Sequence, residues 1–256
     1  MKELYFETIA GSEQIIRDAV IDLESSEDVL MIRSGLNILD LQGWYKFLNS
    51  HPRLQEDRRH FNFDKDLSIA DWWEISYQPE YASSYAYSKT RQPLHCDNAW
   101  FDDGAEINFF AMKRQAISGG EQVIYPVSRL LEDLSAIEPG LLNDLLMTQV
   151  KIKKGDSGYD HLTTILKDDD STKCYWNFYR TEKKDPFVDK MCDRFFLFLN
   201  DQEATSSVYR LHCNTGDCMA FNDSLVLHGR EAFEATKPLD RILFQSMWKI
   251  KNDESI

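Results

Sequence analysis

The chain has 256 residues, of which 43% are hydrophobic and 12% aromatic, and its formal net charge is −14. This composition supports a substantial core and excludes global disorder. It also excludes nucleic acid or an anionic membrane surface as the main partner, because both demand a basic surface. No stretch approaches the roughly 18 apolar residues of a membrane span, and residues 1–7 lack the apolar part of a signal peptide, so we expect neither.

We expect a single domain over residues 1–256. Neither an internal repeat nor a low-complexity segment nor a flexible linker interrupts the sequence, and the length is ordinary for one β-rich domain. The five cysteines are odd in number and form no C-x-x-C pair, which is typical of reduced thiols in a cytoplasmic protein. The sequence indicates no particular oligomeric state.

The first 70 residues predict an α/β elaboration. Residues 12–23 and 38–48 carry apolar residues at helical spacing, and the apolar run 29–33 predicts a buried strand. Aromatic residues then crowd between positions 72 and 87, where a core interpretation is favoured over a substrate-binding one.

The next segment contains Pro93-Leu94-His95-Cys96-Asp97-Asn98 within residues 88–99, which are predicted to form a strand. Because side chains alternate along a strand, we expect His95 and Asp97 on one face and Cys96 on the other. Two such ligands can bind one first-row metal ion. The best third ligand is His228, 133 residues further on, which we expect to face the core from a loop edge. Two histidines and one carboxylate are the ligand set of non-haem Fe(II) oxygenases.

The remainder of the chain alternates strands with inserted helices. Helical spacing begins near residue 127 and returns at 185–200, with a polar loop over 154–173 between them. This order predicts a two-sheet β-sandwich or jelly roll over 85–250, with peripheral helices and a helical insert of about 127–200. The predicted strands are 107–112, 122–125, 174–179, 208–211, 218–221 and 242–250.

Arg241 lies 13 residues after His228, at the start of the last predicted strand. A small dicarboxylate bound to the metal needs a guanidinium at its far end, and arginine suits this role through its fixed fork of donors. The turn at Ser118-Gly119-Gly120 is expected to keep a neighbouring strand close to the metal. The polar turn at Asn222-Asp223, which follows Gly216-Asp217 and an apolar strand, is expected to return the chain so that His228 faces the core.

In combination, these motifs resemble the TauD/TfdA-type, clavaminate-synthase-like family of Fe(II)- and 2-oxoglutarate-dependent oxygenases. The matching residues run in family order across about two-thirds of the chain. They are His95-x-Asp97, Ser118-Gly119-Gly120-Glu121, Gly216-Asp217, Phe221-Asn222-Asp223, His228-Gly229-Arg230-x-x-Phe233 and Arg241-x-Leu243.

The resemblance implies an α+β, mostly β fold with a double-stranded β-helix (jelly-roll) core. It implies Fe(II) held by His95, Asp97 and His228, and 2-oxoglutarate whose distal carboxylate binds Arg241. O2 then converts the cosubstrate to succinate and CO2 while a substrate C–H bond is oxidised. Gln122 and Gln245 stand where the family often has threonine and a second arginine, so the expected cosubstrate site keeps its hydrogen-bond donors but has one charge fewer.

Asp97 also bears on the type of oxidation. Halogenating relatives of this family carry a small residue at the carboxylate position, which frees a site for halide. The aspartate therefore predicts hydroxylation, desaturation or a related oxidation, and not halogenation.

Several residues are candidates for substrate binding. Asp102, Asp103 and Glu106 are placed to receive a cationic amine, with a solvated loop as the competing interpretation. Arg180 is placed to bind a substrate carboxylate, and Arg230 is a further candidate. Together they favour a small metabolite as substrate, namely an amino acid or amino-acid derivative of a specialised biosynthetic pathway.

Two other functions stay open from the residues. The first is a jelly-roll metal-dependent isomerase or hydrolase, in which Arg241 would have no role. The second is a catalytically vestigial binding protein, suggested by Gln122 and Gln245.

Overall fold

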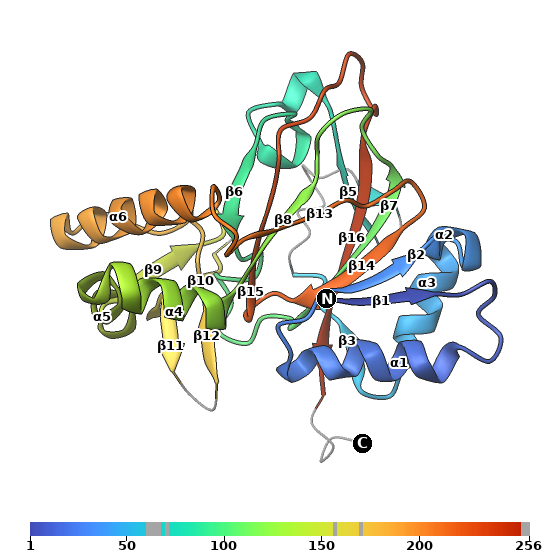
Figure 1. Ribbon diagram of the computed structural model, residues 1–256, viewed down its shortest axis with the longest axis horizontal. Helices are drawn as coiled ribbons and strands as arrows, with labels where there is room; N and C mark the ends of the chain where they lie inside the picture. Colours follow the sequence, from blue (N-terminus) through green and yellow to red (C-terminus); the bar gives the residue numbers. More distant parts are fainter. Residues whose placement is uncertain (60–67, 70–71, 156–157, 169–170, 252–256) are drawn as a thin grey trace.

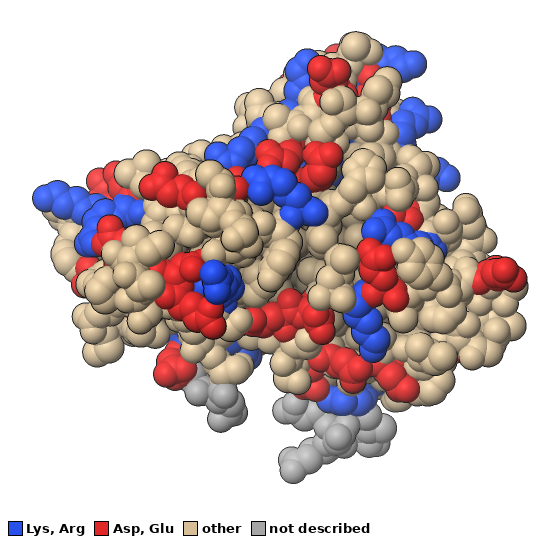
Figure 2. All heavy atoms as spheres, in the orientation of Figure 1, with Lys and Arg blue, Asp and Glu red and all other residues tan. Residues whose placement is uncertain are grey.

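The computed structural model of the protein describes residues 1–59, 68–69, 72–155, 158–168 and 171–251. Two β-sheets face each other at its centre, and helices cover the outer face of each sheet (Figure 1). This arrangement is a jelly roll with peripheral helices, so the predicted fold class is confirmed. Figure 2 shows acidic and basic side chains interspersed over the visible face, with no continuous basic surface there.

The larger sheet has eight strands in the order β1-β2-β14-β7-β16-β5-β4, with β3 paired to β16. Side chains alternate between the two faces of the sheet along its central strand β7 (Ile107–Arg114). Phe109 packs toward the N-terminal helices, and Phe110 packs toward the second sheet. The strands are β1 (Lys2–Tyr5), β2 (Leu30–Arg33), β3 (Leu54–Glu56), β4 (Ser68–Ile69), β5 (Trp72–Ser76), β7 (Ile107–Arg114), β14 (Cys218–Asn222) and β16 (Ile242–Ile250).

The smaller sheet has four strands in the order β13-β8-β15-β6. Strand β15 pairs antiparallel with both β6 and β8, and His228 lies directly opposite His95. Tertiary pairing thus joins the two segments that the sequence identifies as metal-binding. The strands are β6 (Gln92–His95), β8 (Gln122–Pro126), β13 (Tyr209–Leu211) and β15 (Val226–Arg230).

Polar residues interrupt the apolar cluster between the two sheets. Asn108 lies two positions before Phe110 on β7, so alternation places both side chains on the inner face. The same spacing places three more buried polar side chains inward beside the apolar residues of their strands. They are Gln122 on β8, His228 on β15 and Gln245 on β16.

The N-terminal elaboration packs against the outer face of the larger sheet, and its strands β1 and β2 extend that sheet. Trp44 is fully buried there and donates its indole N–H to the carbonyl of Gly35 at 2.9 Å. The helices of this segment are α1 (Glu13–Ile21), the 3-10 turn η1 (Asp22–Ser25), α2 (Gly35–Ile38) and α3 (Leu41–Asn49).

The insert after β8 covers the outer face of the smaller sheet with α4 (Val127–Ile137), α5 (Pro139–Met147) and α6 (Pro186–Gln202). Much of the predicted loop 154–173 instead forms hairpins, because its residues pair with neighbouring segments. Asp169 and Asp170 lie outside the described residues. The hairpins are β9 (Gln149–Lys153) with β10 (Asp160–Thr164), and β11 (Leu166–Asp168) with β12 (Thr172–Cys174).

One other prediction concerns the same region. The predicted strand 174–179 is wrong, because β12 ends at Cys174 and the chain then enters turns. Two 3-10 turns precede β6, namely η2 (Pro79–Tyr81) and η3 (Tyr85–Tyr87).

All five cysteines are free and buried. None of the described helices is long and apolar enough to cross a membrane.

Candidate active site

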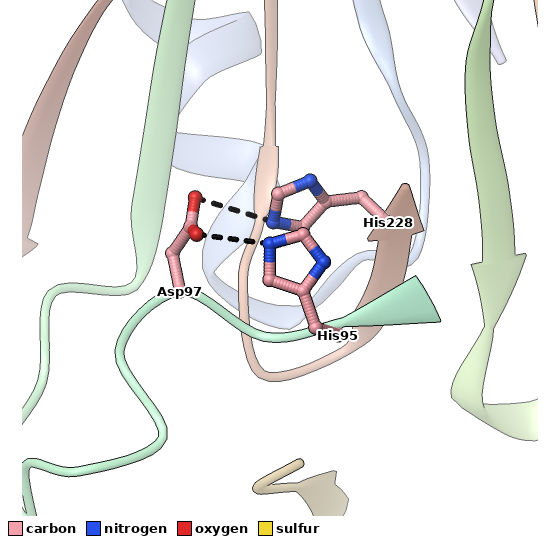
Figure 3. A group of neighbouring side chains, drawn as sticks. All are labelled: His95, Asp97 and His228. Atoms are coloured by element: carbon pink, nitrogen blue, oxygen red, sulfur yellow. Dashed lines mark hydrogen bonds and ion pairs between the residues drawn. The ribbon is translucent and has the colours of Figure 1, made fainter. Parts of the chain in front are cut away.

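His95, Asp97 and His228 converge on one point between the sheets (Figure 3). Each offers a ligand atom, and these atoms all lie within 4.8 Å of one another. Nε2 of His95 lies 3.1 Å from Oδ1 of Asp97, and Nε2 of His228 lies 3.3 Å from Oδ2. Nε2 of His228 is buried and has no hydrogen-bond partner among the described residues, as a nitrogen reserved for a metal requires. Two imidazoles and one carboxylate suit a divalent first-row metal.

Asp97 reaches this point from a turn and not from a strand. The predicted strand 88–99 is wrong at both ends, since β6 begins at Gln92 and stops at His95. Beyond His95, the backbone N–H groups of Asp97 and Asn98 donate to the Asp223 carboxylate at 3.0 and 2.8 Å instead of to a neighbouring strand. The two ligands therefore meet because the chain turns, and strand alternation does not explain their approach.

His228 lies within β15, so its predicted place at a loop edge is also wrong. Opposite it, β6 contains a bulge: two residues lie between Gln92 and His95, whereas only one lies between His228 and Arg230 on β15. The bulge contains Pro93, which has no N–H to pair. A Cβ on Gly229 would lie 2.7 Å from the Gln92 carbonyl oxygen, so glycine allows β6 to pass this close.

Hydrogen bonds orient two of the three ligands, His95 and Asp97. Nδ1 of His95 pairs with the Pro93 carbonyl at 2.9 Å, which assigns its proton to Nδ1 and leaves Nε2 for the metal. Oδ2 of Asp97 accepts hydrogen bonds from Asn108 at 3.0 Å and from Gln245 at 2.7 Å. Gln245 is predicted at the cosubstrate, but the structure places its amide against Asp97, where it orients the carboxylate.

The electrostatics of Asp97 and His228 favour their charged forms despite burial. Burial acts to raise the pKa of Asp97, but His228 and His95 outweigh it and hold that pKa well below its usual range. Burial acts to lower the pKa of His228, but the Asp97 and Asp223 carboxylates raise it to about 9. A divalent cation would satisfy the same carboxylates in place of the imidazolium proton.

A cavity adjoins Asp97 and His228, and two buried arginines line it. Arg241 is 1% exposed and Arg230 is 3% exposed, and Nε of each lacks a hydrogen-bond partner. Within the described part of the chain, neither guanidinium meets a carboxylate. Burial lowers the pKa of both, and Arg241 lowers that of Arg230 further. Two buried cations without a carboxylate partner are an arrangement that would suit an anion, and we call this cavity the arginine cavity.

Neighbouring groups shape the arginine cavity. Gln122 accepts a hydrogen bond from Nη2 of Arg241 at 3.0 Å when its amide is oriented to satisfy its neighbours, and its amide nitrogen then donates to the Gly229 carbonyl. Gly120 has a φ of +79°, and a Cβ there would lie 3.1 Å from Nε of Arg241. Arg230 donates to the carbonyls of Tyr85, Ser88 and Thr90 at 2.8 to 3.3 Å.

The predicted amine-binding residues do not join this centre. Asp103 forms ion pairs with Lys249 at 2.6 Å and Arg59 at 2.7 Å. Asp102 and Glu106 line a separate cavity, which Cys96 also lines. Cys96 packs in the apolar cluster over the outer face of the smaller sheet, away from the metal centre as expected.

The two arginines predicted at the substrate also differ in their surroundings. Arg230 lies in the arginine cavity, two residues beyond His228 on β15. Arg180 is exposed and directly follows Tyr179. Its guanidinium has no carboxylate partner among the described residues.

Three residues at the centre were missed from the sequence. Asn108 is a polar residue inside an otherwise apolar strand, and this interruption was a usable signal. Asp223 accepts hydrogen bonds from the backbone after His95, and its turn was noted without a role. Gln92 lies 3.0 Å from Nε2 of His95, measured from its amide nitrogen, and no local pattern identifies it.

A buried site of two histidines and one carboxylate inside a jelly roll defines the class of non-haem metal oxygenases. The chain belongs to the family described as "Taurine catabolism dioxygenase TauD, TfdA family", whose family model matches residues 15–247. The protein is therefore a dioxygenase of this family, and the resemblance stated from the motifs is confirmed. No curated protein matches the chain in sequence.

Solved structures share this fold at low sequence identity. Asparagine oxygenase, crystallised with Fe(II), 2S,3S-3-hydroxyasparagine and succinate, has a TM-score of 0.66 and 10% identity over 94% of this chain and 79% of its own. The non-haem iron oxygenase OrfP, with Fe, succinate and (3S)-hydroxy-L-Arg, has a TM-score of 0.63 and 12% identity over 96% and 82%. PvcB from Pseudomonas aeruginosa has a TM-score of 0.61 and 14% identity over 94% and 82%.

Proposed function

We propose that the protein is an Fe(II)- and 2-oxoglutarate-dependent dioxygenase that oxidises an unactivated C–H bond of an amino acid or amino-acid derivative. One observation carries this proposal: Asp97 and His228 line the same cavity as the uncompensated guanidinium of Arg241. A metal ligand set at one side of a cavity and an anion site at the other suit a dicarboxylate that chelates the metal.

The residues of the chain divide the work. His95, Asp97 and His228 hold the iron, and Arg241 binds the distal carboxylate of the cosubstrate with Gln122 orienting the guanidinium. Apolar neighbours, including Ile75 and Leu243, exclude water from the same cavity.

When bound, the iron and 2-oxoglutarate supply the oxidising chemistry with O2. One oxygen atom enters succinate, and the other enters the new substrate hydroxyl or leaves as water after a desaturation. The protein's contribution is binding, orientation and exclusion of competing reactions.

An amino-acid substrate agrees with the ligands of the structural relatives, which are hydroxyasparagine in asparagine oxygenase and hydroxyarginine in OrfP. Arg180 remains our candidate for the substrate carboxylate, since its exposed guanidinium follows Tyr179 and has no carboxylate partner in the described structure. We place the reaction in a specialised biosynthetic pathway. The five free cysteines suit a reducing compartment such as the cytoplasm.

Anaerobic titration with Fe(II) and 2-oxoglutarate tests the proposal. A weak visible charge-transfer band should form with the wild-type protein and fail to form in His228→Ala. The matched control is Gln14→Leu, which changes an exposed residue on α1. A metal-dependent isomerase or hydrolase would give neither this band nor succinate in air, and that result would reject the proposal.

A further inference from the structure

A second cavity is lined by His95 together with Pro93 and Leu94, its neighbours on β6. We call it the amide pocket. Gln92 lines both cavities, and its amide nitrogen is 3.0 Å from Nε2 of His95. The amide pocket therefore adjoins the metal ligand His95. Its other walls come from Tyr85 and from the turn Asn177–Tyr179.

The amide pocket carries no formal charge of its own. None of the described residues that line it is an aspartate, glutamate, lysine or arginine. Two of the cations beside it have carboxylate partners outside it: Lys183 pairs with Asp193 at 3.6 Å, and Arg91 pairs with Glu203 at 2.8 Å. The third, Arg180, follows Tyr179 and is the group that we assign to the substrate carboxylate. A charged side chain entering this pocket would lose its hydration and gain no opposite charge.

The pocket offers hydrogen bonds instead of charge. The side-chain amide of Asn177 has no hydrogen-bond partner among the described residues, and neither has Oε1 of Gln92. The amide nitrogen of Gln92 faces the His95 nitrogen that a metal would take, so metal binding leaves this donor free as well. Two carboxamides present both donors and acceptors, which is the complement of a third carboxamide.

Aromatic rings complete the pocket. The hydroxyl of Tyr85 donates to that of Tyr179 at 2.8 Å, and their ring centres are 5.5 Å apart. This contact joins η3 to the turn after β12, and both tyrosines line the pocket. Phe178 supplies an apolar part of its wall.

Resting on the proposed function, we propose that the amide pocket binds the substrate side chain that is oxidised, and that this side chain is neutral and carries a primary carboxamide. The absence of a carboxylate from the pocket disfavours a guanidinium or ammonium side chain. The unpaired groups of Gln92 and Asn177 disfavour a purely aliphatic one, because they would be buried without partners.

The first experiment compares isosteric ligands on the enzyme loaded anaerobically with Fe(II) and 2-oxoglutarate. Calorimetry would measure binding of asparagine, glutamine, aspartate, glutamate, leucine and arginine, each free and as its N-acetyl derivative. Succinate and product formation in air would follow. We expect the carboxamides to exceed the acids, leucine and arginine by about 100-fold in kcat/KM. A preference for any charged or aliphatic ligand, or binding of none, would overturn the inference.

Variants of Asn177 sharpen the test. Asn177→Leu should weaken carboxamide binding at least tenfold while the charge-transfer band with 2-oxoglutarate is unchanged. Asn177→Asp should shift the preference toward arginine, since it introduces the missing carboxylate, and it provides the test if Asn177→Leu does not fold. Gln14→Leu should alter neither. Unchanged carboxamide affinity in both Asn177 variants would contradict the inference.

The two proposals fail in different ways. If the charge-transfer band does not form in the wild-type protein, the proposed cofactor chemistry fails. If the band forms and 2-oxoglutarate is consumed, but carboxamides do not bind, only the assignment of the amide pocket fails.

Discussion

Gln245 on β16 donates a 2.7 Å hydrogen bond to Oδ2 of Asp97, which lies 148 residues earlier in the chain. Asn108 on β7 donates to the same oxygen at 3.0 Å. Both donors stand on the inner face of the larger sheet, whereas both histidines belong to the smaller sheet. The metal centre thus depends on the two sheets keeping their separation.

Replacing Gln245 with leucine should weaken Fe(II) binding, because Asp97 would lose its shorter hydrogen bond. We expect about a 10- to 100-fold loss of iron affinity, the usual effect of removing a group that orients a metal ligand. Competition with a chelator measures it, with Gln14→Leu as control. Unchanged iron affinity, combined with a raised Kd for 2-oxoglutarate, would instead show that Gln245 contacts the cosubstrate.

Replacing Arg241 with methionine should impair cosubstrate binding and spare the iron. A charge-assisted hydrogen bond contributes about 1.5–3 kcal/mol, so the Kd for 2-oxoglutarate should rise roughly 10- to 150-fold. Anaerobic titration of the charge-transfer band measures this. Arg241→Lys should restore only part of the affinity, since an ammonium lacks the two-pronged geometry. Equal cosubstrate affinity in all three proteins would contradict this role.

Gly229→Ala should destabilise the protein and disturb the metal centre. The new Cβ would meet the Gln92 carbonyl oxygen at 2.7 Å, so β6 has to shift, at a cost of about 1–3 kcal/mol. Thermal unfolding and iron affinity measure the two effects. The matched control is Gly140→Ala in α5, where no atom lies within 4 Å of the added carbon and the helix should gain about 0.5–1 kcal/mol. Equal melting temperatures for the two variants would show that the bulge tolerates a side chain.

Turnover in buffered chloride should give oxygenated or desaturated products and no chlorinated product. Asp97 occupies the position that a halide would need, and two hydrogen bonds from the larger sheet hold it there. Mass spectrometry of the products, with bromide in a parallel reaction, checks this. A halogenated product from the wild-type enzyme would contradict the prediction.

Local sequence spacing was enough to identify some site residues, but their contacts were not local. His95, Asp97 and His228 were recognisable because their side-chain chemistry and family order do not depend on geometry. The strand predicted over residues 88–99 is wrong because the backbone N–H groups of Asp97 and Asn98 donate to the carboxylate of Asp223 and not to a neighbouring strand. Asp223 lies 126 residues from Asp97 in the chain. No pattern within the segment contains that information.

The contrast between the two glutamines shows the same limit. Gln122 and Gln245 were both assigned to the cosubstrate, yet only Gln122 lines the arginine cavity, while Gln245 contacts a metal ligand. Likewise, Asp103 follows β6 closely in the chain but forms ion pairs with Arg59 and Lys249, so its charge is not available to a substrate.

The sequence by itself determined the class of the protein, because the ligand types, their order and the arginine that follows them are properties of the chain. Only the tertiary structure decided how Pro93 to Asn98 reach the metal and which surrounding groups remain unpaired. The bulge opposite Gly229, the hydrogen bonds between the sheets and the uncharged amide pocket depend on strands far apart in the sequence. Such contacts follow from long-range pairing and packing, which local propensity and spacing do not specify.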